Sequence, residues 1–171
     1  PTTRRPSRRC KAMLSVKIVA VGGLKEAFSR EACAEYTKRL SAFCRVEVTE
    51  IKEAPLPDKP SEEQIASALE TEGAKILAAL PQRSKKVALC VEGKQMPSER
   101  FASLLSDAAG ETGAVCFVIG SSCGLSPKVK QACDTRLSFS EMTFPHQLMR
   151  VILFEQIYRG MMINSNRKYH K

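Results

Sequence analysis

Residues 114–158 read AVCFVIGSSCGLSPKVKQACDTRLSFSEMTFPHQLMRVILFEQIY and decide the fold. Two apolar runs in this stretch, 115–119 and 135–139, are short, rich in β-branched or aromatic residues and followed by polar segments. Such runs are typical of buried strands. The stretch ends in residues 148–161, which are apolar around most of a helix. It therefore predicts two strands followed by a buried or partner-covered helix.

Each predicted strand leads into a loop with the composition of a binding site. The first loop, 120–126, reads GSSCGLS and ends at Ser126, whose hydroxyl precedes Pro127. A hydroxyl at the N-cap and a proline at the first helical position predict a helix over 127–133. The second loop covers 140–147. Ligands bind at the carboxyl ends of strands in open α/β sheets, so we expect loops leaving two neighbouring strands to form one pocket.

The glycine spacing in the first loop excludes two common nucleotide-binding motifs. Gly120 and Gly124 form G-x-x-x-G. This pattern lacks the third glycine of the dinucleotide fingerprint and the Gly-Lys-Ser/Thr ending of a phosphate loop. A Rossmann dehydrogenase and a P-loop NTPase are therefore disfavoured.

The remainder of the chain alternates strand and helix patterns. Strands are predicted at 16–21, 45–51 and 87–91, and helices at 30–40, 61–80 and 101–109. Ser29 is the predicted N-cap of the first helix, and 92–99 is a predicted polar loop. Ser61 is predicted to begin the second helix, whose core stripe would comprise Ile65, Leu69, Ile76, Leu77 and Leu80. The strict alternation of 45–51 indicates a strand near the sheet edge. This order predicts an α/β fold with a mostly parallel sheet and helices on both faces.

Composition points to a single domain of an intracellular protein. The 171 residues are enough for one core without disulfides. The seven cysteines are odd in number and contain no C-x-x-C, which argues against a zinc ribbon or a secreted disulfide framework. No apolar run reaches the length of a membrane span, and no secretory signal is present. We expect a soluble protein with no membrane partner and no metal.

Much of the net charge of +9 comes from the first residues. Residues 1–12 hold five of the 27 basic residues and no acidic ones, so the remainder carries 22 basic against 18 acidic residues, or +4. We expect residues 1–13 to be a disordered basic leader. It could also be an RNA-binding arm, a remnant of an organellar transit peptide or a mis-start upstream of Met13. Residues 14–171 then form the single folded domain.

Several segments closely resemble one known family. They are VKIVAVGGLKE (16–26), EYTKRL (35–40), VALCVEGK (87–94), CFVIGSSCGLS (116–126), LSFSEMTFPHQLMRVILFEQIYR (137–159) and YHK (169–171). They are similar to the bacterial large-subunit ribosomal RNA methyltransferase H family of the SPOUT superfamily, over about Leu14 to the C-terminus. The resemblance implies a C-terminal trefoil knot, an exception to the general absence of knots. Pattern alone indicates an unknotted flavodoxin-like sheet.

The resemblance also implies S-adenosyl-L-methionine as cofactor. The positions that would bind it are Leu89, Gly120, Phe139, Ser140, Glu141, Met142, Thr143 and Phe144. Adenine is flat and uncharged, so an apolar slot with backbone hydrogen bonds suits it, although the same side chains could simply form core. Ser121 stands where many members of the family carry a second glycine. If the backbone at this position needs a positive φ, a serine there would weaken cofactor binding, because only glycine adopts that conformation readily.

The implied reaction is methylation of N3 of a pseudouridine in large-subunit ribosomal RNA. Catalytic candidates are His170, Tyr169 and Arg150, and RNA-binding candidates are Arg159, Lys171 and Lys168. The nucleobase nitrogen must lose a proton, so a base or a nearby cation would help. Arg150 could instead pair with Glu141 or Glu155, and Glu155 with Arg159 at i, i+4. His146, at a helix start, could be a base or a structural hydrogen-bonding residue.

Relatives with this knot dimerise through the last helix, so we expect a homodimer whose C-terminal tails complete two composite sites. A body charge of only +4 favours the assembled ribosome over free RNA as the substrate. Two alternatives remain open at this point. The chain could be an inactive ribosome-assembly or RNA-binding factor of the same fold, or a small nucleotide-binding module of flavodoxin type. The predicted location is the bacterial cytoplasm, or an organelle if the leader is a transit-peptide remnant.

Overall fold

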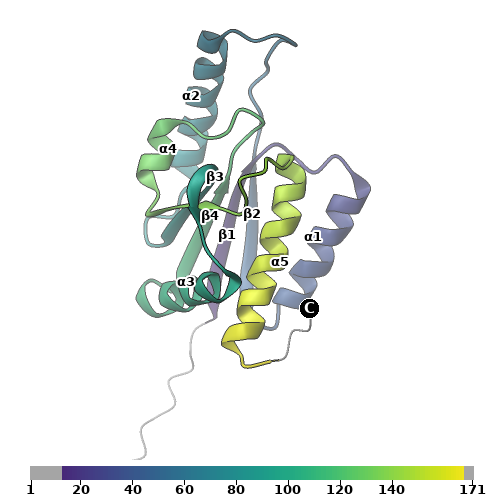
Figure 1. Ribbon diagram of the computed structural model, residues 1–171, viewed down its shortest axis with the longest axis vertical. Coiled ribbons are helices and arrows are strands. Elements are labelled where there is room, and N and C mark those ends of the chain that lie inside the picture. The colour runs from purple at the N-terminus through teal and green to yellow at the C-terminus, as the bar shows by residue number, and fades with distance from the viewer. Residues whose placement is uncertain (1–12, 168–171) are drawn as a thin grey trace, which may run out of the picture.

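The computed structural model describes residues 13–167, which form five strands and five helices in strict alternation (Figure 1). The predicted leader, apart from Met13, and the tail from Lys168 lie outside the described residues. The elements in order are β1 (Leu14–Val21), α1 (Ala27–Leu40), β2 (Cys44–Ile51), α2 (Glu62–Ala79), β3 (Lys85–Gln95), α3 (Ser98–Glu111), β4 (Ala114–Ile119), α4 (Pro127–Ala132), β5 (Thr135–Ser138) and α5 (His146–Asn164).

The five strands form one parallel sheet in the order β2-β1-β4-β3-β5. The predicted parallel α/β architecture is confirmed, and β2 lies at the sheet edge as its alternating pattern indicated. One part of the prediction is wrong. β4 and β5 are not neighbours, because β3 lies between them. Since all strands run in one direction, the loops after β3, β4 and β5 still meet at one edge.

Alternate residues of the strands bury their side chains in two separate cores. Val16 and Ile18 of β1 lie in the core that α1, α3 and α5 cover. Val19 and Val21 lie in the core under α2 and α4. A side-chain period of two along a strand produces this division, and helices cover both faces as predicted (Figure 1).

The predicted N-cap at Ser126 is confirmed, and Ser61, predicted to begin α2, is the N-cap of that helix. The Ser61 Oγ accepts a hydrogen bond from the Gln64 N–H at 3.2 Å, and the Gln64 side chain accepts one from the Ser61 N–H at 2.8 Å, which completes a capping box. Ser126 caps α4 through the Val129 N–H. The prediction for Ser29 is wrong. α1 begins earlier, at Ala27, and the Ser29 side chain is buried inside the helix's first turns.

Two further details of the prediction are corrected. The segment predicted as a polar loop after residue 91 continues β3 to Gln95, with a register shift against β5 between Leu89 and Lys94. The predicted core stripe of α2 is only partly buried. Ile76 is in the core, whereas Leu77 is exposed on the outer side. α2 extends past the end of the sheet, so its first turns have little to pack against (Figure 1).

Strand order does not test the trefoil knot, which stays a prediction. α5 packs against both α1 and α3. It buries Leu153, Phe154 and Ile157, while Leu148 near its start is 39% exposed. Within residues 13–167, no helix combines the length and the apolar character that crossing a bilayer requires.

Candidate functional site

A cavity of about 680 Å³ lies at the carboxyl edge of the sheet, where the loops after β4 and β5 meet above the end of β3. Its wall comprises residues 89–92, 119–125, 137–140 and 142–146, together with Lys130 and Met149. The volume is in the range of small-molecule sites. The prediction that the two loops share one pocket is confirmed, although β3 contributes a third wall.

The loop after β4 folds tightly back on itself. The Gly124 N–H donates to the Ser121 carbonyl at 2.9 Å, and Gly124 has a φ of +87°, which suits glycine at the end of this turn. A Cβ on Gly120 would lie 2.2 Å from the Gly124 carbonyl oxygen. Gly120 is thus required for the loop to close.

The loop after β5 is held by short-range hydrogen bonds. The Ser138 Oγ donates to the Ser140 carbonyl at 2.8 Å, and the Ser140 Oγ accepts from the Met142 N–H at 3.0 Å. Phe139 is anchored against Phe101 of α3, with ring centroids 6.3 Å apart. Met142 is 72% exposed at the cavity margin, so it is free to cover a ligand.

The structure brings together all but one of the residues predicted to bind the cofactor. Those that line the cavity are Leu89, Gly120, Phe139, Ser140, Met142, Thr143 and Phe144. Glu141 is exposed and does not line it. A carboxylate that stays in contact with solvent avoids the cost of burying its charge.

Sequence reasoning missed the contribution of β3 beyond Leu89. Cys90, Val91 and Glu92 line the cavity because β3 bulges where its register against β5 shifts. Glu92 forms an ion pair with Lys130 of α4, and the hydrogen bond from Lys130 lowers the pKa of Glu92. Burial raises the pKa of the Cys90 thiol, which therefore stays protonated near neutral pH. The apolar run 87–91 followed by Glu92 and Gly93 indicated where a strand could end, but not the register shift that brings these residues into the cavity.

Ser121 does not have the positive φ that would have made serine unfavourable at this position. Among residues 13–167, Asn166 is the only non-glycine residue with positive φ. The Ser121 backbone is therefore unstrained. Its hydroxyl donates to the Glu72 Oε2 of α2 at 2.9 Å.

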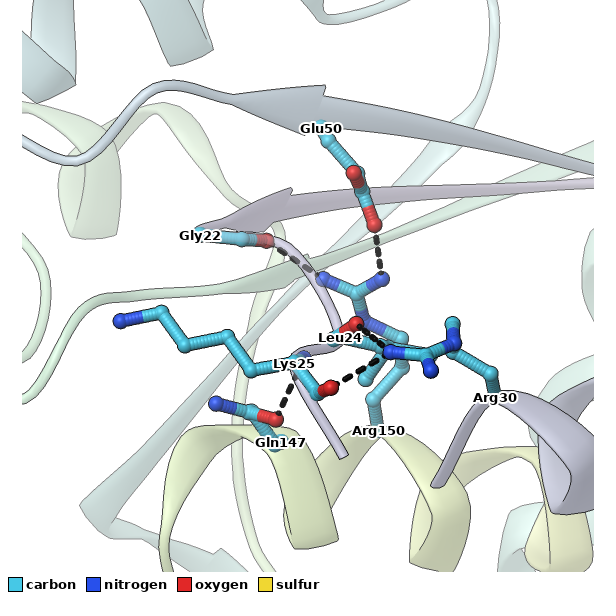
Figure 2. A network of polar contacts seen from close by, with 7 residues as sticks. All are labelled: Gly22, Leu24, Lys25, Arg30, Glu50, Gln147 and Arg150. Atoms are coloured by element: carbon cyan, nitrogen blue, oxygen red, sulfur yellow. Dashed lines mark hydrogen bonds and ion pairs between the residues drawn. The ribbon is translucent and has the colours of Figure 1, made fainter. Parts of the chain in front are cut away.

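Arg150 does not line the cavity. It rises from α5 toward the ends of β1 and β2, where it donates to the Glu50 Oε1 at 2.5 Å and to the Gly22 carbonyl at 2.7 Å (Figure 2). The alternative that Arg150 pairs with a carboxylate is confirmed, but its partner is Glu50 and not Glu141 or Glu155. Only 3% of the Arg150 side chain is exposed. Its predicted catalytic role is untested, but RNA contact would require this buried pairing to break.

A second set of contacts ties the loop after β1 to α5 and α1. The Gln147 Oε1 accepts from the Lys25 N–H at 2.9 Å, and the Arg30 guanidinium donates to the carbonyls of Leu24 and Lys25 at 3.0 and 2.5 Å (Figure 2). His146 lies between the cavity and a shallower depression formed by Gly22, Gly23, Lys25 and residues 50–53. These contacts position the start of α5, where His146 and Met149 form part of the cavity wall.

Of the remaining predicted residues, the structure describes only Arg159, in the second half of α5. Arg159 forms the predicted i, i+4 ion pair with Glu155, at 2.6 Å. Tyr169, His170, Lys168 and Lys171 lie outside the described residues. Their catalytic and RNA-binding roles stay predictions.

Comparisons with known proteins agree with this geometry. Residues 14–170 match the family model described as "Predicted SPOUT methyltransferase". The chain is 45% identical over 159 residues to proteins named Ribosomal RNA large subunit methyltransferase H from Ligilactobacillus salivarius and from Streptococcus sanguinis, with 92% of this chain and 100% of each relative covered.

Solved structures with much lower identity share the fold. A putative methylase family protein from Neisseria gonorrhoeae has a TM-score of 0.56 at 14% identity, covering 98% of this chain and 91% of that chain. A probable methylase family protein from Haemophilus influenzae has a TM-score of 0.55 at 13% identity, covering 91% and 70%. Given the parallel sheet, the cavity built by the loops after β3, β4 and β5, and a family match over nearly the whole length, the chain belongs to the SPOUT methyltransferase family.

Proposed function

We propose that this protein is an S-adenosyl-L-methionine-dependent methyltransferase acting on large-subunit ribosomal RNA. The observation that carries the proposal is the cavity at the carboxyl edge of the sheet, in a chain 45% identical to proteins named for this activity. We further propose that residues 14–171 form one domain.

The cavity fits the cofactor chemically. Leu89, Leu137 and Phe139 provide apolar surface for a flat, uncharged adenine, and the irregular loops at 120–125 and 139–145 offer backbone hydrogen-bonding groups. Lys130 and Glu92, an ion pair in the cavity wall, provide charged groups for the zwitterionic methionine end. S-adenosyl-L-methionine, when bound, supplies a methyl group on a positively charged sulfur.

The acceptor in this proposal is N3 of a pseudouridine. This nitrogen carries a proton that must leave as the new carbon–nitrogen bond forms, so a base or a cation near the nucleobase accelerates transfer. We propose His170 and Tyr169 for this role and Arg159, Lys168 and Lys171 for RNA contact. For Arg150, the buried pairing with Glu50 favours positioning the start of α5 over direct contact with substrate.

A second copy of the chain completes the site in this proposal. α5 is apolar on most of its circumference and leaves Leu148 39% exposed in the single chain. An isologous contact between two such helices would bury this surface and bring one copy's tail near the other's cavity. The low charge outside the leader favours the assembled ribosome as the substrate.

The decisive experiment measures both cofactor and acceptor. We expect calorimetry to detect binding of S-adenosyl-L-methionine, and mass spectrometry of ribosomal RNA to find one added methyl group on a pseudouridine after incubation with ribosomes lacking the modification. Naked ribosomal RNA should be a poorer acceptor. Cofactor binding without methyl transfer to ribosomes or RNA would contradict the proposal, as would the absence of cofactor binding.

Salt should weaken the interaction with the ribosome. Contacts between basic side chains and phosphates release counterions, so the apparent KM for ribosomes should rise steeply between 50 and 200 mM monovalent salt, by about tenfold or more. The affinity for S-adenosyl-L-methionine should change much less over the same range, since it depends mainly on the apolar cavity. Equal salt dependence of the two constants would argue against phosphate contacts.

A further inference from the structure

A hydrogen bond links the wall of the cavity to a buried carboxylate on α2. The Ser121 Oγ donates to the Glu72 Oε2 at 2.9 Å. Ser121 follows β4 and lines the cavity, whereas Glu72 belongs to α2. The bond therefore connects the cofactor loop to a helix that lines no part of this cavity.

Glu72 is placed to serve this connection and has few other partners. Among residues 13–167 it is the only buried acidic residue, at 3% exposure. The Oε1 accepts from the Ala54 N–H at 2.9 Å, so one oxygen holds the segment after β2 and the other holds Ser121. A buried carboxylate is costly unless both oxygens accept hydrogen bonds. The buried Glu72 carboxylate therefore keeps both hydrogen bonds only while Ser121, and with it the loop after β4, stays in place.

The next residue of α2 fixes the other end of the same loop. A Cβ on Gly73 would lie 2.6 Å from the Ser126 Oγ, so α2 can approach the N-cap of α4 only with glycine there. Ser126 in turn caps α4 through the Val129 N–H. Glu72 and Gly73 thus hold the two ends of the loop between β4 and α4.

We infer that Ser121 and Glu72 are positioning residues for the cofactor: their hydrogen bond holds residues 120–125 in the conformation that binds S-adenosyl-L-methionine. This inference rests on the proposed function. In this chain a serine hydroxyl provides a tether to Glu72 that a glycine at position 121 would lack. The effect should appear in cofactor binding more than in the transfer step, because neither residue faces the acceptor in this proposal.

The test compares variants that remove or retain the hydroxyl. Ser121→Ala should raise the Kd for S-adenosyl-L-methionine about tenfold, the value of a hydrogen bond to a charged group. Ser121→Thr should bind S-adenosyl-L-methionine nearly as well as the parent chain. In Ser121→Ala, kcat at saturating cofactor should change less than twofold. Glu72→Gln should also weaken binding, and the double variant Ser121→Ala with Glu72→Gln should be no weaker than the more affected single one.

Glu70→Gln is the matched control. Glu70 lies on the same helix and pairs with Lys128 of α4 at 2.8 Å, but both side chains are exposed, so its loss should leave the Kd unchanged. Should Glu72→Gln fail to fold, the comparison of Ser121→Ala with Ser121→Thr decides alone. Unchanged cofactor affinity in Ser121→Ala would overturn the inference, whereas a parent chain that binds no S-adenosyl-L-methionine would overturn the proposed function instead.

Discussion

Gly120→Ala is expected to lower the affinity for S-adenosyl-L-methionine by about 100-fold. The added Cβ would lie 2.2 Å from the oxygen and 2.5 Å from the carbon of the Gly124 carbonyl, and both atoms belong to backbone that cannot rotate away. The loop must open to relieve the overlap, and the loop is the cavity wall. The same strain should reduce the free energy of unfolding by about 1–3 kcal/mol.

Calorimetric titration and denaturant unfolding measure the two effects separately. Gly110→Ala is the control, since a Cβ there meets no atom within 4 Å and Gly110 lies in α3. It should stabilise the protein by about 0.5–1 kcal/mol and leave cofactor affinity unchanged. Normal binding by a folded Gly120→Ala variant would mean that the loop tolerates rearrangement and does not define the site.

The second large effect concerns the ion pair between Glu50 and Arg150. Removing Glu50, the more exposed partner, should lower the free energy of unfolding more than removing Arg150. Glu50 is half exposed and Arg150 is 3% exposed. Glu50→Ala leaves a buried guanidinium with the Gly22 carbonyl as its hydrogen-bond acceptor, while its Nε already lacks a partner among the described residues. Leaving a buried charge unpaired should reduce the free energy of unfolding by about 3–5 kcal/mol.

Arg150→Met should cost less, about 1–2 kcal/mol. It removes the buried charge and keeps apolar volume, and the freed Glu50 carboxylate can be hydrated. The double variant should therefore be more stable than Glu50→Ala alone. Urea unfolding of the three variants tests this order.

Glu47→Ala is the control for this series. Glu47 lies on the same strand and pairs at 3.5 Å with Lys17, and its side chain is 67% exposed, so the stability change should stay below about 1 kcal/mol. If Arg150→Met proved more damaging than Glu50→Ala, packing of the Arg150 side chain and not its charge would be the main contribution. Loss of methyl transfer with unchanged cofactor affinity in a fully stable Arg150→Met variant would support the predicted catalytic role over positioning of the start of α5, because that part of α5 lines the cavity.

Cysteine chemistry provides a further check on the core. Burial raises the pKa of Cys116 to about 12 and that of Cys44 to about 11, so both thiols stay protonated in the folded state across neutral pH. A thiol-directed reagent at pH 8 should modify them only upon unfolding. Rapid labelling of Cys116 in the native protein would contradict its burial in the core of the sheet, on β4.

The sequence by itself determined the alternation of strands and helices, the parallel sheet and most residues of the cavity. These features depend on local patterns: β-branched runs such as 115–119 bury on both faces, and Ser126 before Pro127 starts a helix. Family resemblance added the cofactor and the residues to which it would bind. Such signals are readable because each involves residues close together in the chain.

Tertiary structure alone decided the contacts between distant residues. Arg150 pairs with a residue 100 positions away, and Ser121 with one 49 positions away. In the sequence, Arg150 had plausible partners nearby and Ser121 had none. The strand order, with β3 between β4 and β5, determines which segments meet. The bulge that brings Cys90 and Glu92 into the cavity likewise depends on pairing with β5, which no local pattern encodes.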